Sequence, residues 1–154
     1  LLEVISVRYA KPAAAGLLPL AAGYVFDFAM LHLPAFFPLY SIVQLALLIG
    51  WGALAYKLSK DAPATACAAL MCAFGLAMLA LDLYQELVLN SYWLNIAGFA
   101  PQMYFLTLLT LFSRIMTPFM SVSEVWPIYT AELAALFASA LAGALLRRRR
   151  EKYL

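Results

Sequence analysis

The stretch that decides the fold is IAGFAPQMYFLTLLTLFSRIMTPFM, residues 96–120. Its apolar part, residues 96–113, is just long enough to cross a hydrocarbon core of about 30 Å as a helix. Pro101 interrupts the start of this part, however, and Arg114 and Pro118 close its end. If the segment crosses a membrane the chain has five spans, and if it does not the chain has four.

The composition places the chain in a membrane. Hydrophobic residues make up 66% of its 154 residues, whereas they are about half of a soluble domain. We therefore expect an all-α fold, a polytopic bundle of transmembrane helices that forms a single domain over residues 1–154. The first partner of such a chain is the lipid bilayer.

The runs on either side of the deciding segment give four spans. Residues 12–56 contain only Asp27 and His32 as charged or histidine residues, and 45 residues of helix would measure about 67 Å, twice the hydrocarbon core. This run must therefore fold back on itself, and the two prolines of LPAFFP, residues 33–38, mark the turn. The predicted spans are residues 13–33, 38–57, 63–88 and 125–146.

The basic residues indicate whether the deciding segment crosses. With five spans, five cations would lie on each side of the membrane, a tie that the positive-inside tendency does not favour. With four spans, both termini are cytoplasmic, nine of the ten Lys and Arg residues lie inside, and only Arg114 lies outside. We therefore predict four spans and interpret residues 94–122 as a re-entrant or interfacial pair of short helices on the outer side, with five spans as the alternative.

The C-terminal residues RRRREKYL, 147–154, form a basic cytoplasmic tail in this interpretation. Cations that follow a long apolar helix are typical of an anchor on anionic lipid, so we expect no nucleic-acid partner. The predicted location is the plasma membrane, of the bacterial inner-membrane type.

Acidic residues lie inside the predicted spans, and all fall in the outer third of the membrane: Asp27, Asp82, Glu86 and Glu132. Small residues share a helix face with them, as Gly75 does with Asp82, and such faces line helix-to-helix contacts. The acids should therefore face the bundle interior, where a charged side chain costs about 2.5–3.5 kcal/mol and needs a reason. The functional hypothesis is a polar cavity, open to the outside, that binds a cation, carries protons or positions a polar substrate.

Each acid can also be explained without a function, because a carboxyl group close to the lipid headgroups can be hydrated. Glu86, close to a loop, could simply mark the end of its helix. Four more polar side chains could support the cavity: His32, Gln44, Gln102 and Arg114. Arg114 could equally be an interfacial anchor, and a single amide within a span is commonly a helix-to-helix hydrogen bond.

Signatures of catalysis and of cofactor binding are missing from the sequence. It has no Gly-rich phosphate loop, no HExxH, no GxSxG and no Asp-rich metal motif. Because His32 is the only histidine, a bis-histidine haem site within one chain is excluded, and we predict no cofactor and no metal site. Cys67 and Cys72 are expected to be small packing residues.

Three classes of function remain. The favoured one is a channel or a proton- or cation-coupled transport component with an outward-facing acidic cavity. Four spans are few for a carrier, so we expect a homo-oligomer or other membrane subunits as partners. The alternative is an accessory subunit of a larger membrane complex, in which the acids pair with cations of other chains. A membrane enzyme with two carboxyl groups as acid and base comes third.

Overall fold

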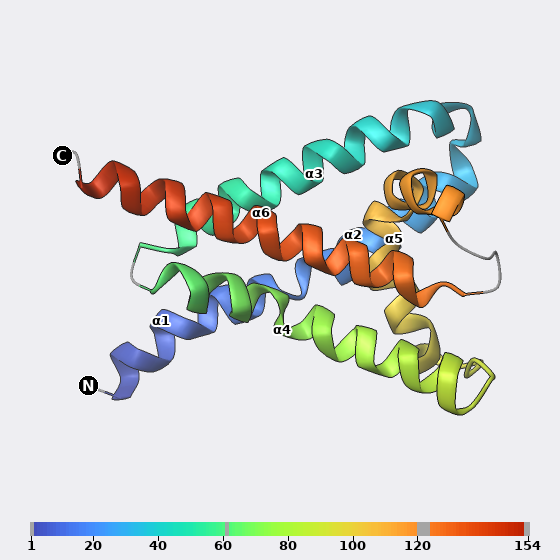
Figure 1. Ribbon diagram of the computed structural model, residues 1–154, viewed down its shortest axis with the longest axis horizontal. Helices are drawn as coiled ribbons and strands as arrows, with labels where there is room; N and C mark the ends of the chain where they lie inside the picture. The colour runs from blue at the N-terminus through green and yellow to red at the C-terminus, as the bar shows by residue number, and fades with distance from the viewer. Residues whose placement is uncertain (1, 61, 120–123, 153–154) are drawn as a thin grey trace.

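The computed structural model describes residues 2–60, 62–119 and 124–152, and these residues form helices and turns with no strand among them (Figure 1). The α-helices are α1 (Leu2–Ala15), α2 (Leu18–His32), α3 (Phe37–Leu58), α4 (Ala64–Leu83), α5 (Ile96–Met116) and α6 (Trp126–Lys152). A π-helical turn, η2 (Tyr84–Val88), continues α4, and the 3-10 turns η1 (Pro34–Phe36) and η3 (Thr117–Phe119) follow α2 and α5. The all-helical class expected from the sequence is confirmed.

Five helical segments of the described chain are long and apolar enough to cross a membrane. They are Arg8–His32, Leu39–Leu58, Ala64–Val88, Ile96–Phe119 and Trp126–Glu151. Four of them overlap the predicted spans, and the fourth in chain order is the segment that decides the span count. Length and composition thus agree with an integral membrane protein.

The first of these segments is broken in the middle. Pro12 lies inside α1, and the chain then makes a tight turn in which the N–H of Gly16 donates to the carbonyl of Ala13 at 3.1 Å. Pro19 follows in the first turn of α2, where its missing N–H has no intrahelical partner to lose. A Cβ atom on Gly16 would lie 2.9 Å from the carbonyl oxygen of Met71, so glycine lets this junction pack closely on α4.

The deciding segment forms one helix, α5, where the sequence favoured a pair of short helices. The side chain of Asn95 caps its start by accepting the N–H of Gly98 at 2.9 Å. Pro101 lies near this start, so it removes only one early backbone hydrogen bond and the helix continues through it. A Cβ atom on Gly98 would meet the carbonyl oxygen of Trp93 at 2.0 Å, which leaves glycine as the residue that fits.

Helices α3 and α6 form a close parallel pair. A Cβ atom on Gly143 would lie 1.9 Å from the carbonyl oxygen of Gly52, so the two backbones are in contact. One turn earlier, the hydroxyl of Ser139 donates to the carbonyl of Leu48 at 2.7 Å. Small residues therefore hold this pair together, as they do in many membrane helix dimers.

Helices α2, α3, α4 and α6 run along the long axis of the molecule, whereas α5 crosses them (Figure 1). Both chain termini lie at one end of this axis, and α5 lies toward the other end (Figure 1). Buried apolar side chains fill the space between α3, α4, α5 and α6, among them Trp51, Met71, Tyr104, Phe105 and Leu136. The polar residues considered next lie on the α5 side of this core.

Candidate functional acid pair

Two acidic side chains are buried, Asp82 on α4 and Glu132 on α6. Glu132 is 0% exposed, and neither of its carboxylate oxygens has a hydrogen-bond partner in the described part of the chain. Asp82 is 1% exposed, and its Oδ2 likewise has no partner there. A buried carboxylate without a partner is strongly unfavourable, which singles out both groups as candidates for a functional role.

Tyr129 connects the two acids electrostatically. Its side chain is 4% exposed and lies one helical turn before Glu132 on α6. The Tyr129 hydroxyl interacts electrostatically with Asp82 and Glu132, and more weakly with Glu86. The Phe105 ring stacks on the Tyr129 ring, with centroids 4.6 Å apart and planes at 16°, and so fixes its position. The site thus comprises residues from α4 and α6, covered by α5.

Glu86 lies one turn beyond Asp82 and binds the start of α6. Its Oε1 accepts the N–H of Val125 at 3.0 Å, and its Oε2 accepts the N–H of Trp126 at 3.3 Å. These N–H groups have no intrahelical partner, and the partial positive charge of the helix N-terminus favours a carboxylate there. Glu86 therefore has a structural role at the rim of the acid pair.

Tyr92, in the turn between η2 and α5, contacts Glu86 at the edge of the site. Its hydroxyl donates to Glu86 Oε2 at 3.2 Å, and its side chain is exposed. Partial desolvation of the phenol, together with its proximity to the Asp82 and Glu86 carboxyl groups, raises the pKa of Tyr92 to about 12. The hydroxyl thus keeps its proton at neutral pH and remains a donor to Glu86.

The π-helical turn η2 positions this part of the site. The extra residue of a π-turn rotates the side chains that follow it, and such turns are frequent at functional sites. Gln85, in this turn, is 0% exposed, and its Oε1 accepts the N–H of Trp93 at 2.9 Å. Asn90 follows with a φ of 49°, a left-handed conformation that asparagine tolerates, and reverses the chain toward α5. The turn thus places Gln85 against the Trp93 backbone and Glu86 against the start of α6.

Asp27 lies apart from this site. It is half-buried on α2 and makes no hydrogen bond or ion pair with the described residues. His32 is exposed at the end of α2, where its Nδ1 donates to the carbonyl of Phe28 at 2.8 Å and its ring stacks on Phe28. Gln102 is half-buried and Arg114 is exposed, and neither makes a hydrogen bond within the described chain.

Gln44 joins α3 to α5. Its side chain is 0% exposed, its Oε1 accepts the N–H of Leu111 at 2.7 Å, and its Nε2 donates to the carbonyl of Leu106 at 3.4 Å. An amide that binds the backbone of a neighbouring helix on both sides holds that helix in place. The structure therefore uses Gln44 to position α5 over the core.

Sequence reasoning did not single out Tyr129 or Gln85 as part of the site. Tyr129 precedes Glu132 by three residues and therefore shares its helix face, a signal that could have identified it. Gln85 follows Asp82 by three residues, so the same signal could have identified it. Of the predicted residues, Asp82 and Glu86 lie within electrostatic reach of each other, and Tyr129 lies within reach of these two and of Glu132.

The arrangement of donor groups does not suit a metal ion. Within residues 2–60, 62–119 and 124–152, no group of three or more His, Cys, Asp or Glu side chains is placed to hold one. Cys67 and Cys72 are both free and buried in the core. No family model, no curated protein and no solved structure matches this chain.

Proposed function

We propose that this protein is a proton-carrying component of a membrane transport system, with Asp82 and Glu132 as the proton-binding groups. The observation that carries the proposal is the state of Glu132, whose side chain is 0% exposed and whose two oxygens lack partners in the described chain. Ionisable residues inside a membrane are rare because they are costly, and they commonly mark proton relays and ion pathways.

A proton suits this site better than a metal cation. Ca²⁺ takes about 6–8 oxygen ligands and Mg²⁺ about six, whereas the site offers two carboxyl groups with apolar surroundings. A proton needs only one oxygen, and it removes the charge whose burial is unfavourable. The site therefore fits a group that is loaded and unloaded with protons.

The rim of the site offers a route for the proton. Tyr92 is exposed, its hydroxyl binds Glu86, and Glu86 interacts electrostatically with Asp82 one turn deeper in α4. Tyr129 then lies within electrostatic reach of both Asp82 and Glu132. These groups form a polar series from the surface to Glu132, of the kind that relays protons.

The arrangement of the helices favours four spans with both termini in the cytoplasm. The termini share one end of the molecule, and α5 crosses the other helices near the opposite end (Figure 1). If α5 lies across the outer half of the bundle, nine of the ten basic residues are cytoplasmic, as the positive-inside tendency favours. The acid pair then loads from the outer side of a plasma membrane.

A partner or a second copy would complete the pathway. On the cytoplasmic side of Glu132 the core is apolar, with Met71, Cys72, Leu136 and Ala140 all buried. The described residues on this side of Glu132 therefore offer no chain of polar groups along which a proton could move. We therefore propose that the chain works as a homo-oligomer or as a subunit of a larger membrane complex.

Proton flux through the native assembly tests this function. The chain is purified from its own membrane in mild detergent with all co-migrating chains, reconstituted in liposomes, and assayed with a pH-sensitive dye under an imposed pH gradient. Glu132→Gln and Asp82→Asn keep the side-chain shape but bind no proton, so each should abolish the flux. Unchanged flux in Glu132→Gln would overturn the proposal.

A matched control separates the site from general effects of charge. Glu124 lies at the same end of α6 and is exposed, so Glu124→Gln removes a carboxylate near the entrance without changing the buried pair. This variant should retain wild-type flux. Equal losses in Glu124→Gln and Glu132→Gln would indicate that surface charge, and not the buried pair, governs the transport.

A further inference from the structure

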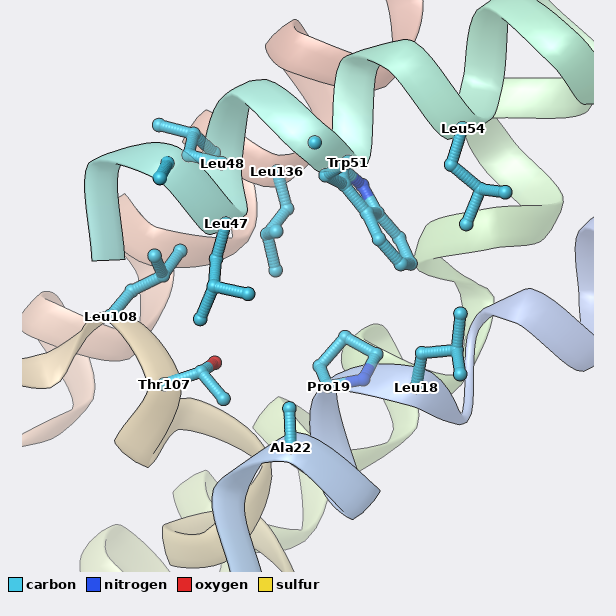
Figure 2. Close-up of a pocket in the computed structure, with 12 residues that line it drawn as sticks. Leu18, Pro19, Ala22, Leu47, Leu48, Trp51, Leu54, Thr107, Leu108 and Leu136 are labelled. Atoms are coloured by element: carbon cyan, nitrogen blue, oxygen red, sulfur yellow. The ribbon is translucent and has the colours of Figure 1, made fainter. Parts of the chain in front are cut away.

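A cavity of about 230 Å³ lies between α2, α3, α5 and α6, away from the acid pair (Figure 2). Its floor is formed by Trp51, Leu108 and Leu136, which are 6%, 1% and 5% exposed. Its rim includes Leu18 and Leu47, which are 51% and 40% exposed. The cavity is thus a recess in the side of the bundle, and it opens between α2 and α3.

The lining offers almost nothing to a polar ligand. Aliphatic side chains surround the recess, and only Thr107 and Trp51 carry polar side-chain atoms there (Figure 2). The Thr107 hydroxyl donates back to the carbonyl of Tyr104 at 3.4 Å, and the Trp51 indole nitrogen lies against Cys72 on α4. A cavity with such walls remains dry and accepts hydrocarbon.

The recess lies at the depth of the acyl chains. Leu18 and Pro19 are near the middle of the candidate span Arg8–His32, and Leu136 is near the middle of Trp126–Glu151. At that depth the surroundings of a membrane protein are lipid tails and not water. The occupant that reaches the open side of the recess is therefore a hydrocarbon chain.

Basic residues lie where the headgroup of such a lipid would be. Leu54, at one end of the recess, precedes Lys57 by one helical turn, and Lys11 lies on α1, before the turn that leads to Leu18. Both lysines are exposed. A basic residue near the membrane surface attracts anionic lipid.

From these observations we infer that the protein binds one anionic phospholipid, with an acyl chain in the recess between α2 and α3 and its headgroup beside Lys11 and Lys57. The inference concerns a different surface from the acid pair. Lipid binding in the recess does not depend on proton transport by the acid pair, so either proposal can fail without the other.

Lipid titration followed by native mass spectrometry tests the site. The delipidated chain in mild detergent is offered phosphatidylglycerol or phosphatidylcholine, and we expect one phosphatidylglycerol to remain bound per chain. A Cβ atom on Gly50 would meet no atom within 4 Å, so Gly50→Trp can extend into the recess and should remove the bound lipid. Ala53→Trp, on an exposed face of α3 outside the recess, should leave it bound.

The lysines should determine the choice of headgroup. Lys11→Gln or Lys57→Gln should each weaken phosphatidylglycerol binding about fivefold, the contribution of one basic residue near an anionic lipid surface. Phosphatidylcholine binding should not change. Equal retention of the two lipids by the wild type, or equal lipid loss in Gly50→Trp and Ala53→Trp, would overturn the inference.

A second measurement leaves the recess unaltered, in case Gly50→Trp does not fold. In a chain with Trp93→Phe and Trp126→Phe, Trp51 is the only tryptophan and lines the floor of the recess. Phosphatidylglycerol with brominated acyl chains should quench its fluorescence at lower lipid concentrations than brominated phosphatidylcholine. Quenching by neither lipid would show that no chain enters the recess and would reject the site.

Discussion

The carboxylate of Glu86 caps α6, which begins 40 residues later in the chain, because its Oε1 accepts the backbone N–H of Val125, the residue before this helix, at 3.0 Å. This hydrogen bond joins the end of α4 to the start of α6, the two helices that enclose the acid pair. It also satisfies a backbone donor that the helix itself leaves free. Glu86 thus ties the helix that carries Asp82 to the helix that carries Glu132.

Replacing this cap should destabilise the protein without removing the acid pair. Glu86→Ala deletes the acceptor of two N–H groups, so we expect the free energy of unfolding to fall by about 1–2 kcal/mol. Glu86→Gln keeps one amide oxygen as an acceptor and should lose less. Reversible unfolding in detergent measures both, with Glu124→Ala as the control, and equal stability of Glu86→Ala and wild type would contradict the capping role.

The close contact of α3 and α6 predicts opposite effects for two glycine substitutions. A Cβ atom on Gly143 would collide with the backbone of Gly52, so Gly143→Ala should cost about 1–3 kcal/mol. Gly50 is on α3 but has open space at its Cβ position, so Gly50→Ala should be neutral or should stabilise the helix by up to about 1 kcal/mol. Thermal unfolding of the two variants in the same detergent gives the comparison, and a stable Gly143→Ala would refute the backbone contact.

Removal of the Gln44 amide should loosen α5. Gln44→Leu preserves the volume but removes the bond to the N–H of Leu111, and we expect a loss of about 1–2 kcal/mol. Hydrogen exchange of the amides around Leu111 should accelerate more than that of α3. Gln102→Leu is the matched control, because Gln102 makes no hydrogen bond in the described chain, and similar exchange in both variants would argue against the role of Gln44.

The number of spans can be measured by labelling single cysteines from outside the cell. Ser91 lies before α5 and Thr117 follows it, so the two positions share a side if α5 does not cross and lie on opposite sides if it does. With four spans, Ser91→Cys and Thr117→Cys should both react with a membrane-impermeant maleimide, in a background where Cys67 and Cys72 are replaced by alanine. Labelling of only one of the two would establish five spans.

The sequence predicted the helical segments well, because apolar length and proline position are local properties. The turn at LPAFFP and the start of α4 after Pro63 both lie where the prolines indicated. The single helix α5 was missed because the distribution of basic residues favoured four spans, with a pair of short helices at residues 94–122. A proline near the start of a helix removes only one early backbone hydrogen bond, and the buried contacts of α5 with the core stabilise the helix.

The acid pair was only partly predictable. Helical spacing placed Asp82 and Glu132 toward the interior, but it also placed Asp27 there, and Asp27 lies apart on α2. Which helices become neighbours depends on packing between distant segments, and one sequence does not reveal it. The π-helical turn that directs Gln85 and Glu86 is likewise invisible in the periodicity, since it adds a residue to a regular helix.

Infrared spectroscopy of the purified chain in lipid tests most directly whether the buried pair exchanges protons with the outside. We predict a carboxylic-acid carbonyl band at neutral pH that shifts in D₂O while the core amides remain protected. The band should lose intensity in Glu132→Gln and in Asp82→Asn, disappear in the double variant, and persist in Glu86→Gln. This result would show that Glu132 carries a proton and that solvent protons reach it. A band that is absent from the wild type, or one that never shifts in D₂O, would contradict the proton-carrying role of Asp82 and Glu132.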